Sequence, residues 1–207
     1  MENKKQLSRE EQLHYIQLIS NRFLKNPRMA LLFNKNKKSF KKNVFNTVNY
    51  CFKVAMYNNG VYVAENNKTI VLFYEHKKLK KRFEDYYRYL KVVRGISLAN
   101  IKKVLQNEKE VKKHKLKVGN YIYVWFIAQE EGYGSLEGLN EINKMLFKLS
   151  ATRNMPILFE TSDIRLLRFY KHVGFDVYKK LKRENETIYF FADKKALEKY
   201  NKVLYFH

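Results

Sequence analysis

The apolar positions between residues 121 and 180 alternate between the periods of strands and helices. Residues 121–128 form an unbroken run of β-branched and aromatic side chains, which predicts a strand buried on both faces. Residues 156–161 form a second such run. The segment between the runs carries apolar side chains at helical spacing, namely Leu136, Leu139, Ile142, Leu146 and Leu149. A helix that joins two such strands suits a right-handed crossover, so the strands are expected to be parallel.

Two amphipathic helices and a hairpin are predicted before this region. A Ser-x-x-Glu capping box at residues 8–11 begins the first helix, which ends at Asn26-Pro27, and the second begins near Ser39. Their inward positions are Leu13, Ile16, Ile19 and Phe23 in the first helix, and Phe40, Val44, Val48, Cys51 and Ala55 in the second. The lysines at positions 37, 38, 41 and 42 lie opposite and are expected to be solvated. Asn58-Asn59-Gly60 closes the second helix, and residues 61–65 and 69–74 predict an antiparallel hairpin.

The segment from Glu75 to Gly119 is more charged. One helix is expected from Lys78 to Val93 and another from Ser97, as N-cap, toward His114. We interpret Phe83, Tyr86, Tyr87 and Leu90 as a packing stripe. Interleaved tyrosine and lysine also form base-stacking surfaces, but core packing is the commoner origin of such a pattern.

The C-terminal part predicts a final hairpin and a terminal helix. The hairpin consists of residues 175–180 and 187–192 around Glu184-Asn185-Glu186, and the helix runs from Lys194 to Asn201. No internal repeat or linker interrupts the chain, so we expect one domain.

Glycines follow the first buried strand at the point where the chain turns into a helix. Gly132 and Gly134 can adopt positive φ and let a ligand approach the backbone, and the amides of the following helix would attract a diphosphate. A tight turn that binds nothing is the alternative. After the second strand, Ser162-Asp163 caps a helix over 164–172, and Gly174 ends it.

Three motifs in this order resemble the GNAT superfamily of N-acetyltransferases, which use acetyl-CoA. Residues Gln129-x-x-Gly132-x-Gly134 match the pyrophosphate-loop signature (Gln/Arg)-x-x-Gly-x-(Gly/Ala). Phe169-Tyr170-Lys171-His172-Val173-Gly174-Phe175 is similar to the Phe-Tyr-x-x-x-Gly-Phe block of the family. Leu158-Phe159-Glu160-Thr161-Ser162 is similar to the strand ending that precedes this block. The motifs cover about a third of the chain, and the two N-terminal helices with their hairpin extend the resemblance to most of it.

The resemblance implies an α+β fold. A GNAT-like single domain has a central, mostly antiparallel sheet with one parallel strand pair, flanked by helices on both faces. In this chain the domain 1–207 would contain the N-terminal helices and hairpin (1–74), a helical insert (75–119), the acetyl-CoA-binding core (120–180) and a C-terminal hairpin and helix (181–207).

The same resemblance places acetyl-CoA on the core. Backbone groups of the strand would pair with the pantetheine arm, and the loop amides would hold the pyrophosphate. The residues implied are Phe126, Ile127, Ala128, Gln129, Glu130, Glu131, Gly132, Tyr133, Gly134, Ser135, Asp163, Leu166, Phe169 and Tyr170.

Acetyl transfer to an amine requires a base near the amine, a donor near the thioester carbonyl and an acid near the sulfur. Tyr170 matches the family tyrosine that commonly protonates the departing thiolate; its alternative role is a core aromatic. Glu160 ends the second strand, where ligands of parallel strands bind, and is the candidate base; its alternative role is a strand-end ion pair.

Three functions are compared for the chain. The first is an acetyl-CoA-dependent N-acetyltransferase that acts on a primary amine. The second is a catalytically impaired CoA-binding GNAT-like protein, because the loop before Gly132 is short and Asp163 stands where the family commonly has asparagine. The third is a basic nucleic-acid-binding protein.

Charge and composition set further bounds. The 207 residues include 42 Lys and Arg against 20 Asp and Glu, a net charge of +22. Because the positive residues are spread along the chain, we do not expect nucleic acid as the main partner. Homodimerisation stays open. The lone Cys51 excludes an intramolecular disulfide, and the histidines at 14, 76, 114, 172 and 207 lack ligand spacing, so no metal site is expected. No apolar run approaches the ~18 residues of a membrane span, so a cytoplasmic protein is expected.

Overall fold

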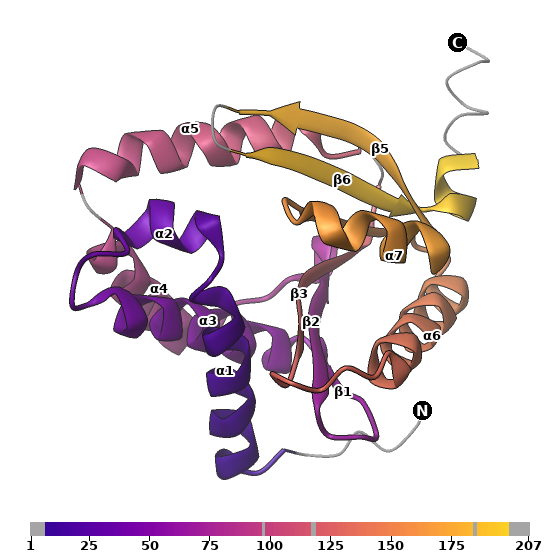
Figure 1. The fold of residues 1–207 in the computed structure, drawn as a ribbon, viewed down its shortest axis with the longest axis horizontal. Helices are drawn as coiled ribbons and strands as arrows, with labels where there is room; N and C mark the ends of the chain where they lie inside the picture. Colours follow the sequence, from indigo (N-terminus) through magenta and orange to yellow (C-terminus); the bar gives the residue numbers. More distant parts are fainter. Residues whose placement is uncertain (1–6, 97, 117–118, 184–185, 199–207) are drawn as a thin grey trace.

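The computed structural model describes residues 7–96, 98–116, 119–183 and 186–198. The helices are α1 (Arg9–Phe23), α2 (Pro27–Phe33), α3 (Phe40–Tyr57), α4 (Phe83–Gly95), α5 (Leu98–His114), α6 (Glu137–Arg153) and α7 (Leu167–His172), with 3-10 turns η1 (His76–Lys78) and η2 (Ile164–Leu166). The strands are β1 (Val61–Val63), β2 (Thr69–Glu75), β3 (Ile122–Gln129), β4 (Ile157–Thr161), β5 (Phe175–Lys182) and β6 (Thr187–Asp193). Figure 1 shows their arrangement.

The strands form one sheet in the order β1-β2-β3-β4-β6-β5. Within the described chain, β3 and β4 are the parallel pair, and the other neighbours are antiparallel. The predicted α+β class, with a mostly antiparallel sheet and one parallel pair, is therefore confirmed. In Figure 1 the β5–β6 hairpin runs across the molecule at a steep angle to β2 and β3.

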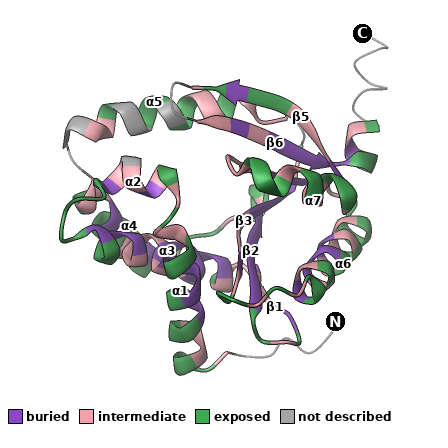
Figure 2. Ribbon diagram, viewed as in Figure 1, coloured by how far each residue is buried: buried purple, intermediate pink, exposed green. Residues whose placement is uncertain are grey.

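Helices cover both faces of the sheet because side chains alternate along the central strands. Ile70 and Leu72 of β2 belong to the core beneath α1 and α3, whereas Val71 and Phe73 pack in the core that contains Ile142 of α6. Residues of β2 are almost all buried, as Figure 2 shows, since both of their faces are covered. The sheet thus separates α1, α3 and α4 from α6 and α7.

The N-terminal helices follow the predicted pattern with two corrections. The capping box at Ser8 and Glu11 begins α1, and α3 buries its predicted apolar face, including the thiol of Cys51. Leu13 was expected inside but is 49% exposed. Asn26-Pro27 does not end α1, which stops at Phe23. Instead Asn26 caps the short helix α2, because its side chain accepts from the Arg28 amide and proline suits the first helical position.

Two expectations for α4 were wrong. The helix begins at Phe83 rather than Lys78, because the carboxylate of Asp85 accepts a hydrogen bond from the Arg82 amide and fixes the start there. The stripe predicted to pack is exposed: Phe83 is 88% and Tyr86 58% exposed, and Tyr87 and Leu90 are similar. The helix instead buries Asp85 and Val92 toward α3.

The remaining elements agree with the sequence, apart from Leu136. This residue is the N-cap of α6 and is 54% exposed, so the apolar face of α6 starts later than expected. The helix predicted over 164–172 is divided into η2 and α7. Ser97, Glu184, Asn185 and residues 199–201 of the expected terminal helix lie outside the described residues, while 194–198 are helical. Among the described helices, none is long and apolar enough to cross a membrane.

Candidate active site

The two parallel strands separate soon after they meet. Cα pairing between β3 and β4 comprises Ile122 with Ile157 and Tyr123 with Leu158. Beyond these pairs β3 continues to Gln129 alongside β2, and β4 continues to Thr161 alongside β6. The facing edges of the two strands therefore carry backbone groups with no ladder partner across the gap. Such an open edge can accept an extended ligand as an additional strand would bind.

The side chain of Gln129 braces the loop that follows β3. Its amide nitrogen Nε2 donates to the Ser135 carbonyl oxygen at 2.6 Å, which closes residues 130–135 into a compact turn. The side chain of Gln129 thus supports the loop. The expected cofactor contact of this residue is through its backbone and stays a prediction.

Several amides of this loop are available to a ligand. The Glu130 amide donates to the Lys68 carbonyl and the Tyr133 amide donates to the Glu130 carbonyl. In contrast, the amides of Glu131, Gly132, Gly134 and Ser135 make no hydrogen bond within the described chain. They precede α6, whose N-terminal dipole favours an anion at the same position. The loop therefore fits a diphosphate through its backbone, whereas the amide of Glu130 does not contribute.

The two glycines of the loop differ in conformation. Gly132 has φ of 82°, a left-handed value that other residues adopt at a cost, whereas Gly134 has no such value. A Cβ added at either position would meet no heavy atom within 4 Å. The space above both glycines thus remains open for a close approach to the backbone, as expected from the sequence.

Charges around the loop are balanced. Glu131 forms an exposed ion pair with Lys25 at 2.7 Å, and this contact lowers the pKa of the Glu131 carboxyl. The Lys68 ammonium lies 4.7 Å from the centre of the Tyr133 ring. Two lysines therefore lie beside the loop and offset the acidic side chains that a phosphate would otherwise meet.

Tyr170 of α7 lies in an aromatic cluster beside β4. Its ring centre is 4.6 Å from that of Phe159 and 5.4 Å from that of Phe191. Burial and the Asp163 charge raise the pKa of Tyr170 to about 12. The hydroxyl makes no hydrogen bond within the described chain. A phenol held in this way stays protonated at neutral pH and has a proton to donate.

Asp163 is engaged by its own turn. Its carboxylate accepts from Nε and Nη2 of Arg165 at 2.9 and 2.7 Å and also caps the Arg165 amide. The guanidinium holds the pKa of the Asp163 carboxyl below its usual value. Leu166 is 38% exposed and Phe169 is half-buried against Tyr170. These residues line the start of α7, while the Asp163 charge is neutralised by Arg165.

Glu160 lies on the face of β4 opposite to Phe159 and Tyr170, in a buried charged network. Its Oε2 accepts a short hydrogen bond from the Tyr123 hydroxyl and lies 3.9 Å from Lys115 Nζ, while Oε1 lies 3.7 Å from Arg28 Nη1. Burial lowers the pKa of the Lys115 ammonium, and burial together with the Glu160 charge raises that of the Tyr123 phenol. The carboxylate is thus about 90% buried yet surrounded by polar partners.

The same network extends to Glu186, which lies 3.7 Å from Nε of Arg28. Arg28 Nη2 and Glu186 Oε2 are buried and make no hydrogen bond within the described chain. Buried polar atoms without a hydrogen bond lower the stability of the fold unless a further polar group binds them. This side of the sheet therefore provides unused donors and acceptors near the Glu160 carboxylate.

Arg28, Lys115 and Tyr123 were not identified from the sequence. Alternation along β3 offered a signal for Tyr123, because Tyr121, Tyr123 and Trp125 share one face. Arg28 belongs to a helix that was not predicted, and Lys115 follows α5. Long-range packing brings these residues to Glu160, and no local pattern records it.

No protein-family model and no curated sequence matches the chain. The fold, however, is that of the GNAT N-acetyltransferases, because the solved structures that superpose on most of the chain come mostly from this superfamily. An agmatine N-acetyltransferase has a TM-score of 0.59 and 10% identity, with 90% of this chain and 96% of that chain covered. The polyamine N-acetyltransferase of Drosophila melanogaster has a TM-score of 0.54 and 9% identity over 87% and 95%.

Another protein with this fold is the C-terminal condensation domain of Ebony, solved with beta-alanyl-dopamine. It has a TM-score of 0.54 and 8% identity, with 90% of this chain and 95% of that chain covered. Identities of this size show the fold alone. Activity must therefore be argued from the residues of this chain.

Proposed function

We propose that the protein is an acetyl-CoA-dependent N-acetyltransferase that acts on a primary amine. The observation that carries the proposal is the gap between β3 and β4, which ends in a glycine turn with four amides that no described residue uses. An extended arm that ends in a diphosphate matches this combination of an open strand edge and an anion-binding turn.

The cofactor would be held mainly by backbone groups. The edge of β3 at Phe126 to Ala128 would pair with the pantetheine arm, and the amides of Glu131, Gly132, Gly134 and Ser135 would hold the pyrophosphate. Leu166, Phe169 and the ring of Tyr170 supply apolar surface beside the arm, and Asp163 positions the turn through Arg165. When bound, acetyl-CoA supplies a thioester that an amine can attack and a sulfur that leaves as a thiol.

Tyr170 and Glu160 are suited to the two proton transfers. Residues 159 and 160 point to opposite faces of β4, so the Tyr170 phenol beside Phe159 and the Glu160 carboxylate lie on opposite faces of the sheet. Glu160 would take one proton from the acceptor ammonium, and Tyr170 Oη would give one proton to the departing sulfur. The second proton that the nitrogen loses on becoming an amide would reprotonate the Tyr170 phenolate. Tyr170 enters this step as a neutral phenol, because its raised pKa keeps the proton on the hydroxyl at neutral pH.

Binding and turnover test the proposal separately. Acetyl-CoA at roughly 100 times its Kd is expected to raise the Tm by about 5–10 °C. Thiol release is then followed with agmatine, a polyamine, an arylalkylamine and a lysine peptide as acceptors. The absence of both stabilisation and release would overturn the proposal. Stabilisation without release from any amine would instead establish the impaired CoA-binding protein.

The Tyr170→Phe variant distinguishes a role of Tyr170 as catalytic acid from a role as an aromatic packing residue. The ring remains in its cluster, so acetyl-CoA affinity should stay within about twofold, while kcat should fall by roughly 100-fold or more. Because the parent phenol has a raised pKa, its loss should be visible across neutral pH. Equal kcat values for variant and parent would remove the acid role and leave Tyr170 as a packing residue.

A further inference from the structure

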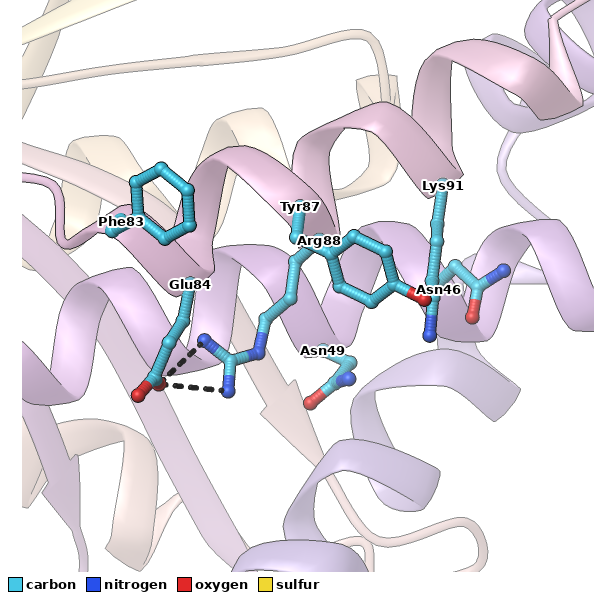
Figure 3. A pocket seen from close by; sticks show the side chains of 7 residues that line it. All are labelled: Asn46, Asn49, Phe83, Glu84, Tyr87, Arg88 and Lys91. Atoms are coloured by element: carbon cyan, nitrogen blue, oxygen red, sulfur yellow. Dashed lines mark hydrogen bonds and ion pairs between the residues drawn. The ribbon is translucent and has the colours of Figure 1, made fainter.

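A groove runs along the surface between α3 and α4. Its volume is about 460 Å³, and its lining includes Asn46, Asn49, Phe83, Tyr87, Arg88 and Lys91. Figure 3 shows α4 contributing the aromatic and cationic side chains and α3 the two amides. None of these residues belongs to the glycine turn or to the Glu160 network.

The aromatic side chains of the groove are unusually exposed. Phe83 is 88% and Tyr87 57% exposed, although both were expected to pack inside. The Lys91 ammonium lies 4.6 Å from the centre of the Tyr87 ring, so one cation accompanies this stacking surface. Phe83 and Tyr87 are four residues apart on α4 and therefore lie on one face of the helix, where a planar ligand can stack on their rings.

Both amides on α3 have free hydrogen-bonding capacity. The side chains of Asn46 and Asn49 make no hydrogen bond with the described residues, and both are half-buried in the groove. An amide offers one acceptor and a two-hydrogen donor, which is the set that base edges complement. Aromatic faces beside such amides suit a nucleobase better than a lipid chain or an acidic peptide.

Positive charge continues beyond this groove. A second groove of about 360 Å³ shares Glu84 and Arg88 with the first and adds Lys53 and Arg82. Burial, then the charges of Arg88, Arg82 and Arg9, lowers the pKa of Lys53. Two carboxylates oppose these cations. Glu84 is engaged by Arg88, as the dashed lines in Figure 3 mark, and the buried Asp85 accepts from Arg88 Nη1 at 2.9 Å and lies 3.6 Å from Arg82 Nη2. Lys53 and Lys91 are the lysines of the two grooves, and neither pairs with a carboxylate of the described chain, so both can attract a phosphate.

We propose that the groove between α3 and α4 binds single-stranded nucleic acid, with bases stacked on Phe83 and Tyr87. The base edges bond Asn46 and Asn49, and Lys91 and Lys53 contact phosphates along the path. A second copy of this chain would bring like charges together across a two-fold axis, which disfavours self-association through this face. This assignment connects the net charge of +22 with a nucleic-acid partner, which the even spread of positive residues along the sequence did not indicate. It does not depend on the proposed acetyltransfer.

Fluorescence anisotropy with labelled oligothymidylate and oligouridylate of about 15 nucleotides tests the proposal on the full chain. If two to four phosphates are contacted, raising NaCl from about 50 to about 200 mM should weaken binding roughly 7- to 50-fold. Tyr87→Ala should weaken it roughly 5- to 150-fold through lost stacking. Tyr86→Ala is the matched control, because Tyr86 is equally exposed on α4 but does not line the groove.

Lys91→Gln should reduce the salt slope by about 0.7, as expected for one phosphate contact, whereas Lys144→Gln on the exposed face of α6 should leave the slope unchanged. The melting temperature of each variant shows that it is folded. Salt-independent binding would overturn the proposal. Equal effects of Tyr87→Ala and Tyr86→Ala on oligonucleotide affinity would also overturn it. The proposal would fail as well if Tyr87→Ala weakened binding to heparin or to phosphatidylserine vesicles as much as it weakens binding to the oligonucleotide.

Discussion

At the scale of single residues, the surroundings of Glu160 are compatible with two roles, a catalytic base and a member of a structural ion network. A carboxylate between Arg28 and Lys115, with a phenol bonded to it, resembles a structural ion network. Yet both ion pairs exceed hydrogen-bond length, and Arg28 Nη2 keeps no hydrogen bond within the described chain. The unused acceptor of the network is Glu186 Oε2, and together with the Glu160 carboxylate it can accept hydrogen bonds from an ammonium, whereas the Arg28 donor cannot.

Glu160→Gln distinguishes these roles when it is compared with Glu186→Gln. Both residues are about nine-tenths buried and both face Arg28, so each neutral variant should lose roughly 1–3 kcal/mol of stability, as a broken and partly screened buried pair does. Only Glu160→Gln should lower kcat, by roughly 100-fold or more, if this carboxylate takes the proton. Denaturant unfolding and thiol release measure the two effects. A rate that falls equally in both variants would contradict the assignment.

At the scale of elements, the turn between β3 and α6 depends on backbone conformation more than on side chains. Gly132→Ala forces a Cβ into a left-handed position and should cost about 1–2 kcal/mol. It should also weaken acetyl-CoA binding, since the added methyl group occupies the approach to the free amides. Gly134→Ala is the matched control. Its backbone tolerates alanine and its Cβ meets no neighbour, so stability should change by less than about 0.5 kcal/mol.

Calorimetric titration with acetyl-CoA and thermal melting provide both comparisons. The signature that the loop resembles accepts glycine or alanine at position 134, so affinity for this control should stay near that of the parent. If Gly134→Ala weakens binding as strongly as Gly132→Ala, the difference in backbone conformation between the two glycines has no bearing on the ligand.

The elements that could be predicted from the sequence are those whose signals lie within a short stretch of the chain. The runs that became β3 and β4, the glycine that ends α7, and the capping box of α1 carry their signals within a few neighbouring residues. Helix α4 shows where this fails. Its spacing identified an apolar stripe, but spacing does not reveal whether another element covers that stripe. Here a cap by Asp85 sets the start of the helix and Val92 faces the core, which leaves Phe83 and Tyr87 in solvent.

The Glu160 network shows the same limit at longer range. Arg28, Lys115 and Tyr123 come from three separate elements and meet through the packing of α2 and the end of α5 against the sheet. Only their convergence creates the polar site. A strand-end glutamate was recognisable in the sequence, whereas its partners were not, because ion pairs of this kind leave no periodic pattern.

At the scale of the whole molecule, folding divides the ionisable groups into two sets with opposite pH dependence. Lys53 and Lys115 have lowered pKa values, so their charged forms oppose folding, and this cost disappears as pH rises toward about 10.4. Repulsion from the net charge of +22 weakens over the same range. Both effects predict that stability rises as the solution becomes moderately alkaline.

Buried phenols and the thiol act in the other direction at higher pH. Burial raises the pKa of Tyr170, Tyr178 and Cys51 to about 12, and it also raises the pKa of Tyr74 and Tyr123. Their neutral forms stabilise the fold fully below the unfolded pKa values, about 8.5 for the thiol and about 10 for a phenol. Each contribution is then lost as pH rises toward the folded value, at up to roughly 1.4 kcal/mol per pH unit and per group.

We therefore expect the Tm to reach a maximum between about pH 8 and 10 and to fall steeply above it. Circular dichroism melts at constant ionic strength between about pH 7 and 11.5 measure this curve. Tyr74→Phe is the informative variant, because Tyr74 is buried and its hydroxyl makes no hydrogen bond within the described chain. Removing the phenol should leave the Tm near neutral pH almost unchanged. Above the maximum, the Tm of the variant should fall less steeply with pH, by the contribution of about one ionising group. A Tm that keeps rising through pH 11, or a variant with the parent slope, would show that the phenols ionise as freely in the folded chain as in the unfolded one.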